Sequence, residues 1–262
     1  MPSMQQPTTS NAIGLWTLYV REVRRFMKVY MQTLLAPVVT TLLFLTVFTL
    51  ALGKFRPDIH GVAFTEFLAP GLIMMAIAQN SFANTSSSIM SAKVQGNIVD
   101  TLMPPFSATE LVMGIAFGGV TRGLCVGATV AIAMAIFVGL SLSNAGLIIF
   151  HALMASLMLA LLGIMGGIWA DKFDHMAAIT HFVITPLSFL SGTFYSIDRL
   201  PELGRMLAHL NPFFYMIDGF RSGFIGHADA PSWLGICVLA GINTMLWAGC
   251  TWMFRSGYKL KP

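Results

Sequence analysis

This sequence has few charged residues, and that scarcity excludes most classes of soluble protein. Only 10% of its 262 residues are Asp, Glu, Lys or Arg, whereas 56% are hydrophobic. A soluble domain carries about 25% charged residues, and the mean hydropathy of +0.74 points the same way. The chain is therefore predicted to be an all-α integral membrane protein, because helices satisfy their own backbone hydrogen bonds in lipid.

The sequence also lacks the motifs that carry common catalytic chemistry. It has no G-x-x-x-x-G-K-[ST] segment for nucleotide phosphates, no H-E-x-x-H segment for zinc and no G-x-S-x-G nucleophile motif. Its three cysteines lie in apolar runs at unrelated spacings, which favours neither a disulfide framework nor a metal site. We expect no catalytic residue, metal ion or cofactor on this chain.

Charge-free hydrophobic runs mark the predicted membrane spans, since crossing a bilayer takes about 20 apolar residues. The run 123–170 is too long for one helix and contains turn-forming residues at 140–146, so it is divided into two spans. Six transmembrane helices are therefore predicted, over residues 31–52, 66–90, 111–139, 146–169, 176–196 and 231–253.

The Lys and Arg residues beside these spans predict the orientation of the chain. If both termini are cytoplasmic, most of the positive charge lies on the cytoplasmic side, as is usual for membrane proteins. The outer side then holds Lys54, Arg56, Arg199, Arg205 and Arg221, while Lys261 is cytoplasmic. A multi-pass protein of the inner (plasma) membrane is expected. Because topology accounts for the net charge of +4, no nucleic acid partner is expected.

Residues 11–30 form a predicted amphipathic helix ahead of the first span. Arg21, Arg24, Arg25 and Lys28 share one helical face, and apolar and aromatic side chains occupy the opposite face. This pattern is typical of a helix that lies in the interface of the lipid bilayer.

Glycines recur four residues apart in the third and fourth spans. They form the pairs Gly114/Gly118, Gly119/Gly123, Gly123/Gly127 and Gly163/Gly167. Small residues at this spacing let helices approach closely, so we expect packing within the chain first and dimerisation second.

The span 66–90 is unusually polar for a transmembrane helix. Its side chains include Gln79, Asn80 and Asn84, which either line a wet pathway or hydrogen-bond to neighbouring helices. His181 in the fifth span is open to two interpretations, a pathway residue that relays protons or a satisfied packing histidine.

Three further charged residues lie in apolar surroundings. Arg122 is expected either to pair with an acid, with Glu110 as one candidate, or to extend toward the cytoplasmic surface. Asp218 and Arg221 stand three residues apart, so they either pair locally on one helix or contribute to an outer gate.

The segment 198–226 is predicted to form a helical hairpin before the last span. A first helix, with Asp198 as a possible N-cap, must end at Asn211-Pro212 because a proline disfavours a helical residue before it. A second helix follows and ends at Gly226. Both helices are too short to cross a bilayer, so a re-entrant hairpin on the outer side is expected.

The loop 91–106 is predicted to carry a short amphipathic helix on the cytoplasmic rim. Its apolar residues recur at helical intervals before Pro104-Pro105 ends the pattern. Such a helix is suited to docking into a groove on a soluble partner, and an interfacial loop is the alternative.

These stretches resemble one known family of membrane proteins. The outer segment reads LSGTFYSID over residues 190–198, LP at 200–201, HLNP at 209–212 and DGFR at 218–221. The cytoplasmic loop reads GNIVDTLMP over residues 96–104. Together with the amphipathic first helix, they resemble the permease subunits of type-2 (type V fold) ABC exporters, in the drug and polysaccharide export branch.

The resemblance covers nearly the whole chain and implies a division of labour. It implies a homodimer of single-domain, six-span subunits (residues 1–262), each resting on a separately encoded ATPase that carries ATP and magnesium. The ATPase-coupling residues would be Gln95, Gly96, Asn97, Asp100, Thr101, Leu102 and Pro104. The outer re-entrant gate would include Gly192, Phe194, Tyr195, Pro201, Asn211, Pro212, Asp218 and Arg221. The substrate route would lie between subunits, flanked by the second and fifth spans.

Two other classes of function are weighed against this one. A stand-alone secondary transporter or channel would need ionisable residues at the midplane or an internal repeat, and the sequence shows neither convincingly. A membrane enzyme would need a nucleophile or a metal constellation, which the sequence lacks.

Overall fold

The computed structural model describes residues 11–52, 61–197 and 200–260, and every regular element assigned in these ranges is a helix. The predicted all-helical class is therefore confirmed. Five charged residues that carried predictions of capping or topology lie outside the described residues: Lys54, Arg56, Asp198, Arg199 and Lys261.

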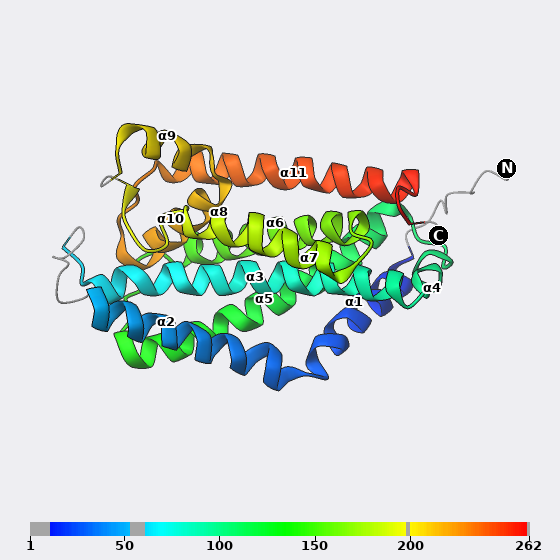
Figure 1. The fold of residues 1–262 in the computed structure, drawn as a ribbon, viewed down its shortest axis with the longest axis horizontal. Coiled ribbons are helices and arrows are strands. Elements are labelled where there is room, and N and C mark those ends of the chain that lie inside the picture. Colours follow the sequence, from blue (N-terminus) through cyan, green and yellow to red (C-terminus); the bar gives the residue numbers. More distant parts are fainter. Residues whose placement is uncertain (1–10, 53–60, 198–199, 261–262) are drawn as a thin grey trace.

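The long helices run roughly along one direction, so the molecule is an elongated bundle (Figure 1). In chain order they are α2 (Ala36–Leu52), α3 (Phe64–Val94), α5 (Ala108–Val138), α6 (Ala145–Trp169) and α11 (Ser232–Ser256), whereas α1 (Ala12–Met27) is inclined to them and η1 (Met31–Leu35) leads directly into α2 (Figure 1). The continuous helical run α7 (Phe173–Ile179), η2 (Thr180–Ile184) and α8 (Thr185–Phe189) packs beside them. The short helices are α4 (Ile98–Leu102), α9 (Glu202–Leu210) and α10 (Pro212–Ile225).

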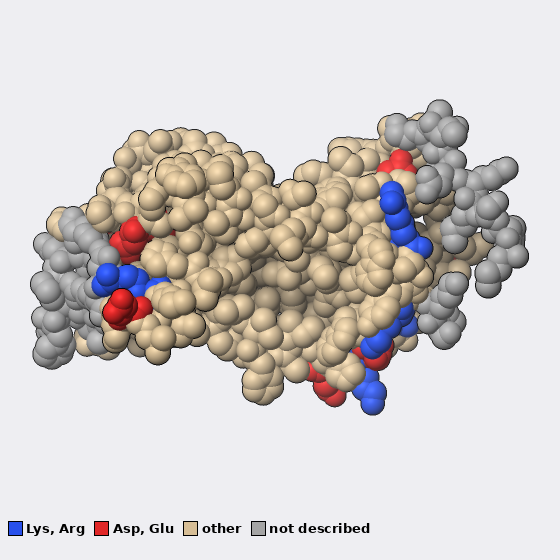
Figure 2. Space-filling model, turned by 90° about the horizontal axis from the view of Figure 1, so that it is seen from above, with Lys and Arg blue, Asp and Glu red and all other residues tan. Residues whose placement is uncertain are grey.

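The bundle has two ends with different contents. The start of α1, helix α4 and the last turn of α11 lie together at what we call the terminal end (Figure 1). Helices α9 and α10 lie at the opposite end, the hairpin end (Figure 1). Lys, Arg, Asp and Glu side chains gather toward these ends and leave an uncharged middle on the face drawn in Figure 2. An uncharged belt between charged ends is what a protein that spans a bilayer requires.

Helix α3 occupies the centre of the bundle, packed between α5 and α6. Glycines on the two neighbours make this close approach possible. A Cβ atom on Gly119 would lie 2.6 Å from Cγ2 of Thr85, and one on Gly167 would lie 3.0 Å from Cβ of Ile89. Gly123 is in contact with Ser81 in the same way. The glycine pattern therefore serves packing within the chain, as expected first.

Four described helices are long and apolar enough to cross a membrane: Met31–Ala51, Ala108–Val138, Ala145–Trp169 and Ser232–Ser256. They coincide with the predicted first, third, fourth and sixth spans. Helix α3 covers the predicted second span and extends beyond it at both ends. The predicted fifth span corresponds to α7–η2–α8, but its helix ends at Phe189 rather than at residue 196.

Helix α1 is amphipathic, as predicted, and lies against α5. Leu18, Glu22 and Phe26 face inward, whereas Trp16 and Met27 remain exposed. Gly114 and Gly118 of α5 accommodate this contact, because a Cβ atom at either position would lie 2.5 Å from a side-chain carbon of Leu18 or Glu22. The inward face thus includes one acidic residue that the amphipathic pattern did not single out.

Candidate functional site

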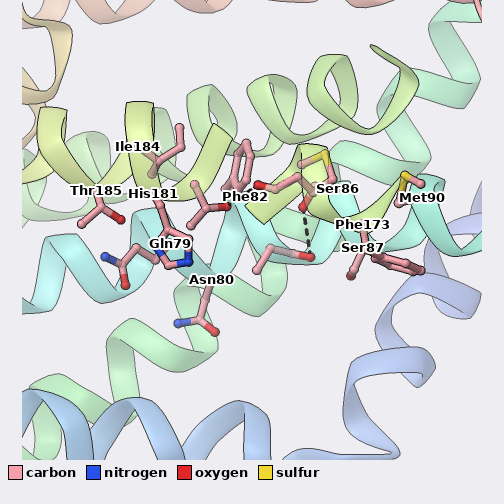
Figure 3. A pocket seen from close by; sticks show the side chains of 13 residues that line it. Gln79, Asn80, Phe82, Ser86, Ser87, Met90, Phe173, His181, Ile184 and Thr185 are labelled. Carbon is pink, nitrogen blue, oxygen red and sulfur yellow. Dashed lines mark hydrogen bonds between the residues drawn. The ribbon is translucent and has the colours of Figure 1, made fainter. Parts of the chain in front are cut away.

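A groove runs between α3 and the α7–η2–α8 run, and we call it the α3 groove (Figure 3). Its volume is about 500 Å³. It is lined by Gln79, Asn80, Phe82, Ala83, Ser86, Ser87, Met90, Phe173, Met176, Thr180, His181, Ile184 and Thr185. The polar residues Gln79, Asn80 and His181, predicted from sequence as pathway candidates, thus meet in one groove although about a hundred residues separate α3 from η2 in the chain.

A second, smaller groove lies on another side of α3, against η1 and α2, and we call it the α2 groove. Its volume is about 270 Å³, and its polar lining includes Gln32, Thr40 and Thr41. Gln79 and Asn80 line both grooves. Gln79 and Asn80 therefore lie on the part of α3 that separates the two grooves.

Asn84 lines neither of these two grooves and instead hydrogen-bonds to a neighbouring helix, the second of the two interpretations given for it. It is fully buried, and its side-chain oxygen accepts a hydrogen bond of 3.1 Å from Arg25 of α1. Thr85 likewise donates to the backbone carbonyl of Ala160 on α6 at 2.7 Å. The polar residues of α3 thus divide by helical face: some line the grooves, and others hydrogen-bond to neighbouring helices.

Glu22 is the centre of a buried ionic network that sequence reasoning missed. Only 1% of its surface is exposed. Its carboxylate accepts hydrogen bonds from Arg21 and Arg25 at 3.2 Å and from Ser88 of α3 at 2.9 Å. An acidic residue set among arginines on a membrane-facing helix was the available signal, because a buried charge must be paired. The network fixes α1 to the terminal half of α3.

Arg122 of α5 pairs with no described acid, and Glu110 instead completes a capping box with Ser107 at the start of α5. The Arg122 guanidinium donates one hydrogen bond, of 3.2 Å, to the side-chain oxygen of Asn80. Its Nε lies buried and has no hydrogen-bond partner among the described residues. Arg122 therefore contacts Asn80, one of the two residues that line both grooves, from α5.

The predicted amphipathic helix over 91–106 is shorter than expected. Helix α3 continues to Val94, Gly96 adopts a left-handed conformation with φ of 73°, and only Ile98–Leu102 form α4. Because a positive φ cannot continue a right-handed helix, Gly96 separates the two pieces. Pro104-Pro105 follow α4, as predicted, and both are exposed.

Most of the predicted coupling residues are displayed on the surface of the terminal end. Gln95, Gly96, Asn97, Asp100 and Pro104 are exposed, whereas Thr101 and Leu102 are half-buried. Ile98 points inward and anchors α4 in a hydrophobic cluster that includes Leu260. Thr101 accepts a hydrogen bond of 3.2 Å from Arg21 of α1. Helix α4 is therefore held by contacts on its inner face, and its outer face is exposed.

At the hairpin end, α9 and α10 are separated at Asn211-Pro212 and α10 ends at Gly226, as predicted. Helix α9 begins at Glu202, with Pro201 as its N-cap residue. Asn211 caps α10 by accepting the amide hydrogen of Phe213 at 3.0 Å, and it also donates to the carbonyl of Leu187 at 2.9 Å. This one side chain therefore fixes the bend against α8.

Asp218 and Arg221 form no ion pair with each other, so the predicted local pairing is wrong. Asp218 accepts the backbone amide hydrogens of Asp229 and Ala230 at 2.9 and 3.0 Å. Arg221 donates to the carbonyl of Gly192 at 2.7 Å, and its guanidinium carbon lies 3.8 Å from the ring centre of Phe67. Each side chain thus bonds to backbone groups outside α10, although Nε of Arg221 has no hydrogen-bond partner among the described residues.

The loop that follows α8 is held by aromatic and hydrogen-bonding contacts. Phe194 stacks between Phe48 of α2 and Phe189 of α8, with ring centres 4.6 and 5.0 Å apart. The hydroxyl of Tyr195 donates to the carbonyl of Leu190 at 3.1 Å. Of these residues, Gly192 contacts Arg221, and Phe194 and Tyr195 follow it in the same loop, whereas Pro201 is exposed at the start of α9.

The described residues offer no group of three or more His, Cys, Asp or Glu side chains that could hold a metal ion. The grooves on α3 have no acidic lining residue, and their polar groups are amides, hydroxyls and one imidazole. Such polar groups can hydrogen-bond to a molecule bound in the grooves.

Two comparisons with known proteins bear on this architecture. Residues 14–225 match the family model described as ABC-2 type transporter. The chain is 37% identical over 219 residues to the inner membrane transport permease YadH of Escherichia coli K12, covering 84% of this chain and 86% of that protein. It is also 27% identical to nodulation protein J of Rhizobium leguminosarum bv. trifolii, over 83% of this chain and 82% of that protein.

The family match spans α1 through α10, and therefore includes the grooves on α3, the α4 rim and the hairpin end. The relative YadH aligns over a similarly large share of the chain at an identity that establishes common descent. This protein is a membrane transport permease, and it belongs to the ABC-2 type transporter family.

Proposed function

We propose that this chain is the permease subunit of an ATP-driven exporter and works as a dimer with a second copy of itself. Two copies of a separate ABC ATPase would bind at the terminal end and supply ATP and magnesium. The substrate would be an amphipathic molecule, drug-like or a lipid-linked glycan, that passes out of the cytoplasm along the dimer interface. The chain itself would catalyse no reaction.

The proposed topology has six spans and cytoplasmic termini in the inner membrane. Helix α3 and the α7–η2–α8 run would join the four more apolar helices as the second and fifth spans. The polar residues of α3 lower its hydropathy, but most of them face the buried network or the grooves rather than lipid. Residues 198–226 would then form the outer re-entrant hairpin, which the near-complete burial of α10 supports.

The proposal rests on one observation: α3 extends from the two grooves to α4 at the terminal end. Gln79 and Asn80 stand on its groove-facing surface, and the same helix runs on without a break to Val94, directly before α4. A push on α4 by an ATPase would therefore tilt α3 as a rigid rod and change the width of both grooves. Differential contact of the ATPase with two positions of α4 is all that such coupling requires.

The exposed apolar residues of the rim give a test. Met103 is 76% exposed at the end of α4, and Leu203 is 72% exposed on α9 at the hairpin end. Met103→Glu should prevent co-purification of the ATPase partner and abolish ATP-driven export, because a charge would enter the docking surface. Leu203→Glu, the matched control, should retain the partner.

The outcome that contradicts the proposal is equally concrete. Intact export by Met103→Glu together with retained ATPase would remove α4 from the coupling path. Transport driven by an ion gradient, in vesicles that contain this chain and no ATPase, would instead establish the stand-alone transporter or channel.

A further inference from the structure

Arg122 has fewer hydrogen-bond partners than Arg25 and Arg221, the other two arginines that contact the interior of the bundle. Arg25 is paired with Glu22 at 3.2 Å. Arg221 donates to two backbone carbonyls and lies over an aromatic ring. Among the residues that the structure describes, Arg122 has one hydrogen bond, to the neutral side chain of Asn80, and no ion pair.

An unpaired guanidinium in apolar surroundings is costly unless an anion joins it. Arg122 lies near the middle of α5, and Leu124 and Gly123 beside it are apolar. Its Nε is buried and lacks a partner. Arginine keeps its proton under all physiological conditions, so the cost cannot be removed by deprotonation. The site therefore favours the arrival of a negative charge.

Asn80 connects this charge to the grooves. Because Arg122 can only donate hydrogen bonds, the atom of Asn80 that it contacts must be the amide oxygen. The amide nitrogen of Asn80 donates one hydrogen to the carbonyl of Ala76 at 3.0 Å. Its second hydrogen has no acceptor among the described residues, and the side chain lines both grooves. The Arg122–Asn80 pair thus presents a polarised donor to a bound molecule.

The groups around this donor are of the right kind for an anion. Gln79 lines both grooves beside Asn80, and the ring of His181 lies beside Gln79 in the α3 groove (Figure 3). No Asp or Glu lines either groove in the described chain. With donors present and carboxylates absent, the local potential attracts negative charge and repels positive charge.

We propose that the Arg122–Asn80 pair is a recognition site for the anionic head, a phosphate or a carboxylate, of an amphipathic substrate. The apolar lining of the α3 groove, which includes Phe82, Met90 and Ile184, would hold the hydrocarbon part. This assignment deepens the proposed export function by naming the substrate class. It rests on that function for the direction of movement, whereas binding can be measured without ATP or a partner.

The probe is dodecyl phosphate labelled with a fluorophore, titrated into the purified full-length chain in nanodiscs of phosphatidylcholine. Dodecyltrimethylammonium, with the same tail and the opposite charge, is the competitor that should fail. Arg122→Gln should weaken binding of the phosphate probe about tenfold to a hundredfold, the range expected for loss of a charged hydrogen-bond partner. Arg122→Lys should retain binding to within about threefold, because the charge remains.

Two further variants distinguish loss of the anion site from loss of the folded structure. Asn80→Asp places a carboxylate beside Arg122, so it should abolish phosphate binding while supplying the missing counter-charge and preserving or raising thermal stability. Arg205→Gln, on exposed α9 at the hairpin end, removes the same charge and should bind the probe as the unaltered chain does. Equal affinity of the unaltered chain, Arg122→Gln and Asn80→Asp, or displacement of the probe by the ammonium compound, would overturn the site.

Two competition experiments distinguish the possible sources of the anion. Competition by inorganic phosphate would support a head recognised from solution, and competition only by nanodiscs that contain phosphatidylglycerol would support a lipid headgroup. Failure of the export proposal would look different, since the purified chain would still bind dodecyl phosphate while dodecyl phosphate would leave ATP hydrolysis by the complex unchanged.

Discussion

The hairpin end and the terminal end of the bundle use polar residues in opposite ways. At the hairpin end, Asp218 and Arg221 are buried and bind backbone groups of distant loops. At the terminal end, α4 turns Asp100 and Met103 outward and keeps only Ile98 inside. A buried polar group that loses its hydrogen-bond partner destabilises the folded state, whereas an exposed group can bond to water instead. Substitutions at the hairpin end should therefore affect stability, and those on the rim should affect interaction with a partner.

The largest effect on stability is expected for Asp218→Ala. The carboxylate is 4% exposed and accepts two backbone hydrogen bonds that hold the loop before α11. Its removal leaves two amide hydrogens of low exposure without an acceptor, at a cost of about 4 kcal/mol. Thermal unfolding of the detergent-solubilised chain measures this loss. Asp174→Ala, an exposed carboxylate on α7, is the control and should leave the midpoint unchanged; a similar midpoint for both variants would mean that the two bonds contribute little.

Arg221→Lys should be the next most damaging substitution. The guanidinium joins α10 to the loop at Gly192 and Thr193 and lies over Phe67. A lysine keeps the charge but loses the planar group that makes these contacts together, at a cost of about 3 kcal/mol. Arg205→Lys on α9 provides the matched exposed change. If Arg221→Lys unfolds at the temperature of the unaltered chain, charge alone holds the loop and the planar contacts are dispensable.

A smaller loss is expected at the terminal end for Ile98→Ala. Ile98 is the one buried residue of α4, and it packs in a cluster that includes Leu260. Truncation should cost about 2 kcal/mol, at the lower limit for core residues, because α4 is short and lies at the surface. It should also weaken ATPase binding, since the rim would lose its anchor. The neighbouring exposed Val99→Ala should leave unfolding unchanged; equal effects of the two variants would show that α4 is not anchored through Ile98.

Helix boundaries were predictable where local chemistry determines them. Asn211-Pro212 separates α9 from α10, because a proline disfavours a helical residue before it, and Gly226 ends α10 with a φ of 73°. The long spans follow from hydropathy, because lipid imposes the same length on every crossing. Gly96 was visible in the sequence too, but its left-handed conformation was not, so α4 was predicted to be longer than it is.

The partners of buried polar residues could not be predicted, because they depend on how the helices pack. Arg122 meets Asn80, 42 residues earlier in the chain, rather than the nearer Glu110. Asp218 bonds to the backbone of Asp229 and Ala230 and forms no ion pair with Arg221, although the two share a helix. The sequence left Asn84 open between a pathway residue and a helix-to-helix contact, and its hydrogen bond from Arg25 of α1 is of the second kind. Sequence spacing determines which face a residue occupies, and only the fold determines what that face meets.

The smallest effect is expected for Lys259→Gln, which alters an exposed contact at the terminal end. Lys259 donates to Asp171 at 2.9 Å and to the carbonyl of Trp169 at 3.0 Å. The hydrogen bond from Lys259, followed by the nearby charges of Lys259 and Lys93, holds the pKa of Asp171 below its usual value. Lys259→Gln should raise that pKa toward the ordinary range and leave the unfolding temperature at neutral pH almost unchanged, because exposed ion pairs contribute little.

The ion pair between Lys259 and Asp171 also predicts how the stability of the protein changes with pH. Since the pKa of Asp171 is lowered in the folded protein, its contribution to stability is present above the pKa of the unfolded chain and is lost as pH falls through the folded value. Any small advantage of the unaltered chain over Lys259→Gln should therefore vanish in strong acid, where Asp171 is protonated in both. Unfolding midpoints measured from neutral to strongly acidic pH test this. A difference that grows in acid would show that Lys259 acts through Trp169 or another contact rather than through the carboxylate.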